Sequence, residues 1–423
     1  MQRAPYVAIL VMIMLGPATA VAAPGEHIIA GDAVITPKID LGLEYRTNGY
    51  RREANAFATS NIRVAPGFEV SAKGAQTELE ASGTSELRYT LVSGADNRAN
   101  LDRFSDFNVT SALRLLTEQA VQFQFTETAG LRNNIVAAGL VDNPFNTQFR
   151  NDLAFKVPIR VGPTLEFAPR GGWGFDEFRV PDYSQPGTSS TYPRHLNSRN
   201  ALTGGLDGKF TFLPRTAAIF EGDYTFNGWS HNIVSARDPN DSGSAITVPN
   251  SSFVKLSAGL RGRFTKNMVL VLTGGWGMGN YSASGGVPAA LADMDVRGFD
   301  RFRMLLQAKQ EFAKDNVVTA GYRRDFDDSW FTNYVAYNYL YVRSENRIGE
   351  HVYTTAEAGV RFEKYAGEVA RGDTVPRIKG DVAYTLQNWL SVSGGVWFDQ
   401  RASDDYMVEY TDVNIHMLMN VAY

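Results

Sequence analysis

Residues 153–167 alternate between apolar and polar side chains without interruption. Successive side chains of a β-strand point to opposite faces, so this pattern predicts one long strand with two unlike faces. A strand that crosses a bilayer needs roughly 9–11 residues, with lipid on one side and water on the other. The charged residues Lys156 and Arg160 fall on the polar face. The apolar face consists of Leu153, Phe155, Val157, Ile159, Val161, Pro163, Leu165 and Phe167.

The same alternation recurs along most of the chain. Residues 39–45, 79–91, 254–264, 302–312 and 413–423 show it most clearly. We expect about eighteen membrane strands, joined alternately by short and long connections as in barrels with short periplasmic turns and long outer loops. The expected strands include 149–167 and 172–183, with a turn at 168–171 between them. The predicted fold class is therefore all-β, an antiparallel up-and-down transmembrane β-barrel with both termini on the periplasmic side.

The two ends of the chain carry the signals of an exported barrel. Arg3 precedes an apolar segment from Val7 to Leu15, and small residues follow up to Ala22. That order is typical of a secretory signal peptide, so we expect residues 1–22 to be removed and residues 23–423 to form one barrel domain. We expect the terminal aromatic residue, Tyr423, to be the signal that the barrel assembly machinery reads. The expected location is the Gram-negative outer membrane, with outer-membrane lipid around the barrel.

Composition and motifs argue against several classes of function. The chain has no cysteine, which excludes a disulfide scaffold, a thiolate metal site and a cysteine nucleophile. The five histidines lack metal-ligand spacing, and no nucleophile elbow or phosphate-binding loop occurs. The net charge is -4 and no basic patch is present, which argues against a nucleic-acid partner. We therefore expect no enzyme, no cofactor and no metal, and we interpret the glycine-rich residues 274–279 as a barrel strand.

Charged side chains on the polar faces define a candidate lumen lining. A lysine or arginine that faces lipid costs roughly 2–4 kcal/mol at the membrane midplane, so mid-strand charges are expected to face inward. They carry both signs, which predicts a hydrated wall without strong ion selectivity. The alternative is that most of them pair across strands and only stabilise the barrel. The candidates are Glu44, Arg88, Lys156, Arg160, Glu166, Lys209, Glu221, Asp223, Arg261, Arg263, Arg301, Arg303, Glu357, Arg361 and Asp381.

Two orientations are open for the segment that contains Tyr337, Tyr339 and Tyr341. If the tyrosines face lipid, Asn338 faces the lumen. If they face inward, they form an aromatic column on which sugar rings stack, and Leu340 faces lipid. An asparagine in the middle of a lipid-facing surface is costly, so we favour the orientation with the tyrosines toward lipid.

Two segments resemble the beta-barrel porin 2 family. One runs from Arg199-Asn200 through Leu213-Pro214-Arg215-Thr216 to Glu221-Gly222-Asp223-Tyr224, and the other from Arg150-Asn151 through Ala168-Pro169-Arg170. Proteins of this family accompany exopolysaccharide synthesis and export in Gram-negative bacteria. The resemblance implies an outer-membrane channel for a secreted polysaccharide, which works with a periplasmic polysaccharide-export protein and an inner-membrane co-polymerase. One alternative is a general or sugar-selective diffusion porin, and another is an outer-membrane enzyme or adhesin barrel.

Overall fold

The computed structural model describes residues 27–48, 58–93, 102–132, 147–179, 195–229, 233–234, 245–246, 250–282, 298–328, 334–366, 371–404 and 409–422. The strands of the first half are β1 (Ile28–Ala30), β2 (Ala33–Arg46), β3 (Ala58–Lys73), β4 (Thr77–Ser93), β5 (Asp102–Leu115), β6 (Phe123–Arg132), β7 (Thr147–Lys156), β8 (Ile159–Val161), β9 (Leu165–Arg179), β10 (His195–Leu213) and β11 (Thr216–Trp229). Those of the second half are β12 (Ile233–Val234), β13 (Ala245–Ile246), β14 (Asn250–Arg263), β15 (Met268–Ser282), β16 (Phe299–Ala313), β17 (Asn316–Asp328), β18 (Tyr334–Ile348), β19 (Val352–Ala366), β20 (Gly372–Gln387), β21 (Leu390–Ser403) and β22 (Tyr410–Ala422). Among all the described residues, no helix is long and apolar enough to cross a membrane. The predicted signal peptide, residues 1–22, and the predicted assembly signal, Tyr423, lie outside the described residues.

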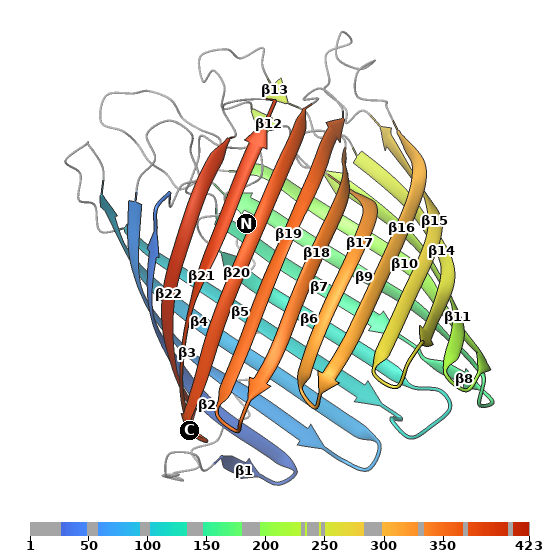
Figure 1. Cartoon of the computed structure of the whole chain (residues 1–423), viewed down its shortest axis with the longest axis horizontal. Helices are drawn as coiled ribbons and strands as arrows, with labels where there is room; N and C mark the ends of the chain where they lie inside the picture. Colours follow the sequence, from blue (N-terminus) through green and yellow to red (C-terminus); the bar gives the residue numbers. More distant parts are fainter. Residues whose placement is uncertain are drawn as a thin grey trace, which may run out of the picture.

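Eighteen of these strands form one closed antiparallel barrel, which confirms the predicted fold class. The barrel closes where β22 pairs with β2, from Lys38 opposite Ala422 to Arg46 opposite Asn414. Figure 1 shows the tilted strands, with short hairpin turns at the same end as the C-terminus. Short turns mark the periplasmic end of an outer-membrane barrel. The short strands β1 and β8 extend the same sheet, and β12 and β13 form a separate two-stranded ribbon.

The outward face of β16 shows how the sequence matches the bilayer. Phe302, Leu306 and Phe312 are 45%, 45% and 67% exposed on this face, and they alternate with inward-facing residues such as Arg303. The two phenylalanines are ten residues apart. At ~3.4 Å per residue and a strand tilt of ~40°, they are separated by roughly 26 Å along the membrane normal. Because the apolar band of such barrels is about 25 Å tall, the two rings fit the two membrane interfaces.

Polar side chains reinforce the ladder that closes the barrel. Arg46 on β2 donates from Nε and Nη2 to Oδ2 of Asp412 on β22, at 3.0 and 2.5 Å. The other oxygen of Asp412 accepts a hydrogen bond from the backbone N–H of Asn48 at 3.1 Å. Nearer the periplasmic end, Asn414 donates to Glu44 across the same pair of strands. Both oxygens of the buried Asp412 carboxylate thus accept hydrogen bonds where the barrel closes, as is usual for buried polar groups.

The structure shows that the predicted strand at 149–167 is wrong. β7 ends at Lys156, the short strand β8 follows at Ile159–Val161, and the chain turns at residues 162–164 before β9 begins at Leu165. Residues 168–171, which the sequence analysis placed in a turn, lie within β9. The two predicted strands thus correspond to β7 and β9, with the turn between them moved toward the N-terminus.

Local backbone chemistry explains the position of this turn. Pro158 has no N–H to offer a ladder. Gly162 adopts a φ of 67°, the left-handed conformation that glycine takes most readily. Around this glycine, β8 folds back onto the start of β9 and places Arg160 opposite Glu166. The alternation of the sequence therefore continues through a tight hairpin, which a pattern of period two does not reveal.

A cysteine in place of Pro163 tests this turn, because the chain has no other cysteine. A single strand over 149–167 would place residue 163 against lipid, whereas the structure places it in an exposed turn at the periplasmic end. We expect Pro163→Cys to react with a membrane-impermeant maleimide in opened outer membranes. The control Leu153→Cys, on the outward face of β7, should react only with a lipid-soluble reagent. Equal protection of both cysteines from the impermeant reagent would contradict the turn.

Candidate functional site in the barrel lumen

The strand register defines which side chains line the lumen. Residues directly opposite each other in paired strands point to the same face of the sheet. The face that carries Glu44 on β2 therefore continues through His416 on β22 and Gly395 on β21. The other face carries exposed apolar side chains such as Leu43 and Ile415, 52% and 50% exposed. The lumen lining is the face opposite these lipid-facing residues.

Arg170 on β9 contacts three carboxylates of the two following strands. Its Nη2 lies 3.1 Å from Asp207 on β10, and 3.0 and 2.7 Å from Glu221 and Asp223 on β11. Lys156 on β7 also pairs with Asp207, at 2.6 Å. These side chains are 28–51% exposed, so their pairing contributes little to stability and leaves a hydrated surface. Arg170 was not among the predicted lining residues because the misplaced turn at 168–171 put it outside any predicted strand.

The remaining candidate lining residues fall into two groups. The paired ones are Glu44 with Asn61 and Asn414, Arg88 with Glu86 and Asp106, Arg160 with Glu166, Arg303 with Asp325, Glu357 with Tyr339, Arg361 with Glu363, and Asp381 with His416. The others are exposed, and no acidic side chain of the described ranges forms a salt bridge with them within 4.0 Å. They are Lys209, Arg261, Arg263 and Arg301.

The structure shows that the favoured orientation of Tyr337, Tyr339 and Tyr341 is wrong. The Tyr339 hydroxyl donates to Oε1 of Glu357 at 2.9 Å, and the guanidinium of Arg361 lies 3.8 Å from the centre of the Tyr337 ring. These partners sit on the lumen face of β19. All three tyrosines therefore face inward.

The lipid-facing side of this segment carries Leu340, 48% exposed, and Asn338. The cost expected for Asn338 is reduced because the hydroxyl of Tyr322 donates to its side-chain oxygen at 2.7 Å. A neighbouring strand thus satisfies a polar group that the sequence alone leaves exposed to lipid.

Tyr339 and Tyr341 form a stacked pair, hereafter the tyrosine pair. Their ring centroids are 5.1 Å apart with an interplanar angle of 18°. Each ring lies over a glycine of an adjacent strand: a Cβ on Gly321 would come within 2.6 Å of Tyr341, and one on Gly359 within 2.8 Å of Tyr339. The absence of side chains at these glycines lets the half-buried rings lie against the wall.

A further aromatic side chain, Trp397 on β21, also lines the lumen. Its Nε1 donates to Oδ1 of Asp381 at 3.3 Å, and Nε2 of His416 lies 3.0 Å from the same oxygen. The ammonium of Lys379 lies 4.9 Å from the centre of the indole ring. Within the described ranges, no group of three or more histidine and acidic side chains could hold a metal ion.

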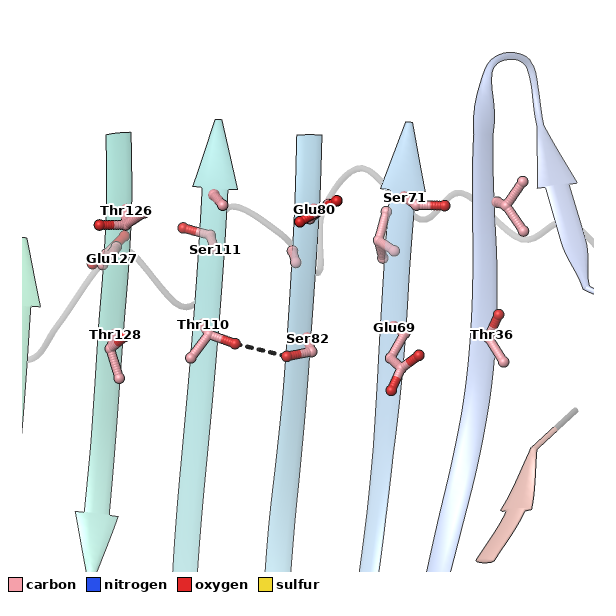
Figure 2. A pocket seen from close by; sticks show the side chains of 14 residues that line it. Thr36, Glu69, Ser71, Glu80, Ser82, Thr110, Ser111, Thr126, Glu127 and Thr128 are labelled. Carbon is pink, nitrogen blue, oxygen red and sulfur yellow. Dashed lines mark hydrogen bonds between the residues drawn. The ribbon is translucent and has the colours of Figure 1, made fainter. Parts of the chain in front are cut away.

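Strands β2 to β6 carry small hydroxyl side chains on the lumen face, shown in Figure 2. The hydroxyls of Ser82 and Thr110 lie 2.7 Å apart, and Glu69 and Glu80 line the same shallow cavity of about 520 Å³. We call this surface the hydroxyl wall. It consists of Thr36, Ser71, Ser82, Thr110, Thr126 and Thr128.

No protein-family model and no curated protein matches the chain. Similar solved structures include the copper transporter OprC, which is 11% identical, with 91% of this chain and 65% of that chain covered at a TM-score of 0.52. Acinetobacter baumannii OccAB3 is 10% identical, with 93% and 100% covered at a TM-score of 0.47. Pseudomonas aeruginosa OccK7 (OpdD) is 12% identical, with 93% and 99% covered at a TM-score of 0.45. At such identities the likeness shows the fold alone. The chain is an integral outer-membrane β-barrel with the fold of outer-membrane channels.

Replacing Arg170 tests whether the charges around it face the ion path. Arg170→Gln removes the positive charge that contacts all three carboxylates and leaves Lys156 paired with Asp207, so the reversal potential in a salt gradient should shift toward cation selectivity. The matched control is Arg324→Gln, which removes a positive charge from the outward face of β17. An equal shift in both variants, or none in Arg170→Gln, would contradict the lumen assignment.

Proposed function

We propose that the chain is an outer-membrane channel through which a secreted polysaccharide leaves the cell. A polymer channel must offer a hydrated wall that binds weakly enough for the chain to leave again. The paired lumen charges around Arg170 and the hydroxyl wall of β2 to β6 support this function. Both present many hydrogen-bonding groups without a strong field of one sign.

The observation that carries the proposal is the tyrosine pair. Aromatic faces carry partial negative charge, which favours contact with the polarised C–H groups of a sugar ring. Glu357 accepts a hydrogen bond from Tyr339 at the edge of the pair and has a second carboxylate oxygen available for sugar hydroxyls. A ring face beside a carboxylate thus offers both kinds of contact that a sugar ring makes.

The two segments that resemble beta-barrel porin 2 imply the same function, although no family model matches the chain. The resemblance adds as partners a periplasmic polysaccharide-export protein at the short-turn end of the barrel and an inner-membrane co-polymerase. The barrel assembly machinery and outer-membrane lipid complete the proposed partners. In this proposal no step requires a catalytic residue, a cofactor or a metal.

Deleting the gene should stop the appearance of surface polysaccharide while synthesis of the repeat unit continues. Complementation with Tyr339→Ala/Tyr341→Ala should restore less polymer than complementation with Tyr339→Phe/Tyr341→Phe, because the second pair keeps both rings. The alanine variant lacks both ring faces, so oligosaccharide binding to the purified protein should weaken about tenfold, which corresponds to ~1.4 kcal/mol. Folding of each variant is checked by heat-modifiable electrophoresis.

A deletion strain with normal surface polysaccharide but impaired uptake of a sugar or an ion would overturn the export function and identify a diffusion porin. Equal polymer export by the alanine and phenylalanine variants would show that the tyrosine pair does not contact the polymer.

A further inference from the structure

The ladder between β16 and β17 ends before the strands do. It runs from Ala313 opposite Asn316 up to Met304 opposite Arg324. Residues 299–303 of β16 and 325–328 of β17 have no register with each other in the described part of the chain. β17 nevertheless stays paired with β18 as far as Asp328 opposite Tyr334, so the hairpin leaves its neighbour as a unit. We call residues 325–328 and 334–337 the hairpin tip.

Hydrogen bonds show that the hairpin tip crosses the inside of the barrel wall. Oδ2 of Asp328 accepts from Asn227 on β11 at 2.8 Å and from Ser251 on β14 at 3.1 Å. Lys255 on β14 donates to the backbone oxygen of Phe326. These partners lie beyond β16 and β15 in the strand order, so the tip has folded inward past both strands.

The base of the tip is held by Asp325. Its two oxygens accept from Nε and Nη2 of Arg303 on β16 at 2.6 and 2.9 Å. Lys255 lies 3.4 Å from the same carboxylate. The side chain of Asp325 is 2% exposed, and a carboxylate this buried must be paired with a cation. Loss of this carboxylate would leave Arg303 without its bidentate partner at the point where the ladder ends.

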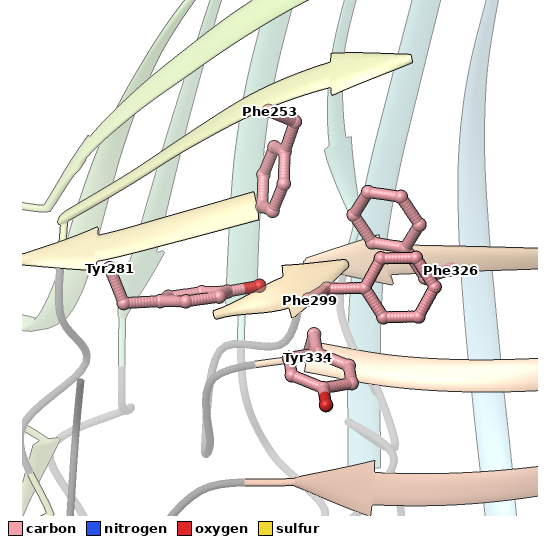
Figure 3. Packing of buried hydrophobic residues seen from close by; sticks show 5 residues of the cluster. All are labelled: Phe253, Tyr281, Phe299, Phe326 and Tyr334. Atoms are coloured by element: carbon pink, nitrogen blue, oxygen red, sulfur yellow. The ribbon is translucent and has the colours of Figure 1, made fainter. Parts of the chain in front are cut away.

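An aromatic layer fills the space between the tip and the wall (Figure 3). Phe326 and Tyr334 from the tip pack against Phe253, Tyr281 and Phe299 from the wall. The rings of Phe326 and Phe299 stack with centroids 3.9 Å apart, and Phe326 is 0% exposed. This cluster has the composition and burial of a small hydrophobic core, which is unusual for the inside of a water-filled barrel.

The glycine-rich strand β15 makes room for this layer. A Cβ on Gly277 would lie 2.3 Å from the Phe326 ring, and one on Gly279 would lie 2.9 Å from the Phe253 ring. Trp276 and Met278 alternate with these glycines on the outward face, 48% and 44% exposed. The segment 274–279 is thus a strand whose inward face is left bare for two phenylalanine rings.

The point where β16 and β17 stop pairing lies where a membrane tolerates an unpaired strand edge. Trp276 on the outward face donates from Nε1 to Asp300 on β16, which lies opposite Met278. An outward carboxylate beside a tryptophan marks the outer interface rather than the hydrocarbon. The unpaired edge of β16 therefore lies at this interface, where water can satisfy its backbone groups.

The inward-folded tip borders a chamber on the inner side of the barrel wall. A cavity of about 710 Å³ is lined by Phe326, Asp327 and Asp328 from the tip and by residues of β6, β7, β9, β10, β11 and β14. The charged residues that β7, β9, β10 and β11 contribute are Arg150, Asp152, Lys156, Arg170, Arg199 and Asp223. A solute in this chamber lies between the tip and these strands.

We propose that the hairpin tip is the constriction that sets the size limit of this channel. It is built from the barrel strands themselves, and the aromatic layer together with Asp325 and Asp328 holds it against the wall. The proposal concerns any solute that enters the lumen, so it stands or falls independently of polysaccharide export.

Removal of the tip tests the proposal. Asp325 and Tyr337 are direct partners, so residues 326–336 can be replaced by Asn-Gly, the two-residue turn that suits a β-hairpin. We expect the unitary conductance in planar bilayers to rise roughly twofold or more, because it follows the open cross-section. Larger oligosaccharides should also enter proteoliposomes. Asp325→Asn/Asp328→Asn, which keeps the chain length, should change both readouts in the same direction.

The control is Glu345→Gln, which removes an exposed lumen carboxylate lower on the same hairpin. Unchanged conductance in this control, with raised conductance in a heat-modifiable deletion variant, supports the constriction. A folded deletion variant with wild-type conductance and size limit overturns it. A rise in Glu345→Gln as large as that in the tip variants also overturns it, because lumen charge rather than tip position would then set the conductance.

Discussion

In a bilayer every backbone N–H and C=O group must find its partner within the protein, and the ladder between β2 and β22 meets this demand by closing the sheet. Asp412 and Arg46 secure the outer end of that ladder. The one ladder described above that ends early, between β16 and β17, does so at the outer interface. The strands stay paired within the hydrocarbon, and the ladder between β16 and β17 ends only at the outer interface. One hairpin can therefore leave the wall without exposing an unpaired strand edge to lipid.

The barrel interior combines two kinds of surface. Charged side chains around Arg170 pair with one another at solvent-exposed positions, so they keep the wall hydrated and add little stability. Aromatic side chains are seated on glycines, both at the tyrosine pair and in the layer beneath the hairpin tip. Glycine on the inward face therefore does not mark flexibility in this barrel. At Gly277, Gly279, Gly321 and Gly359 it marks the places where a phenylalanine or tyrosine ring lies against the wall.

Alternation of side chains predicted the strand number and most lipid faces, because lipid and water select opposite chemistry on the two faces of each strand. It failed at residues 149–167, where Pro158 and Gly162 form a hairpin that keeps the period of two. That error also concealed Arg170. The tyrosines were misoriented because the partner that satisfies Asn338 lies on another strand. The inward fold of the tip depends on contacts among distant strands, which a local pattern does not contain.

The most direct test of the transport account is the ion current through the purified barrel while oligosaccharides cut from the surface polysaccharide of the source cell are present on the periplasmic side. Weak binding along the lumen predicts brief interruptions of the current whose frequency rises with oligosaccharide concentration and whose duration rises with chain length. An uninterrupted current at all concentrations, in a channel that conducts small ions normally, would contradict the claim that the lumen accepts a carbohydrate chain.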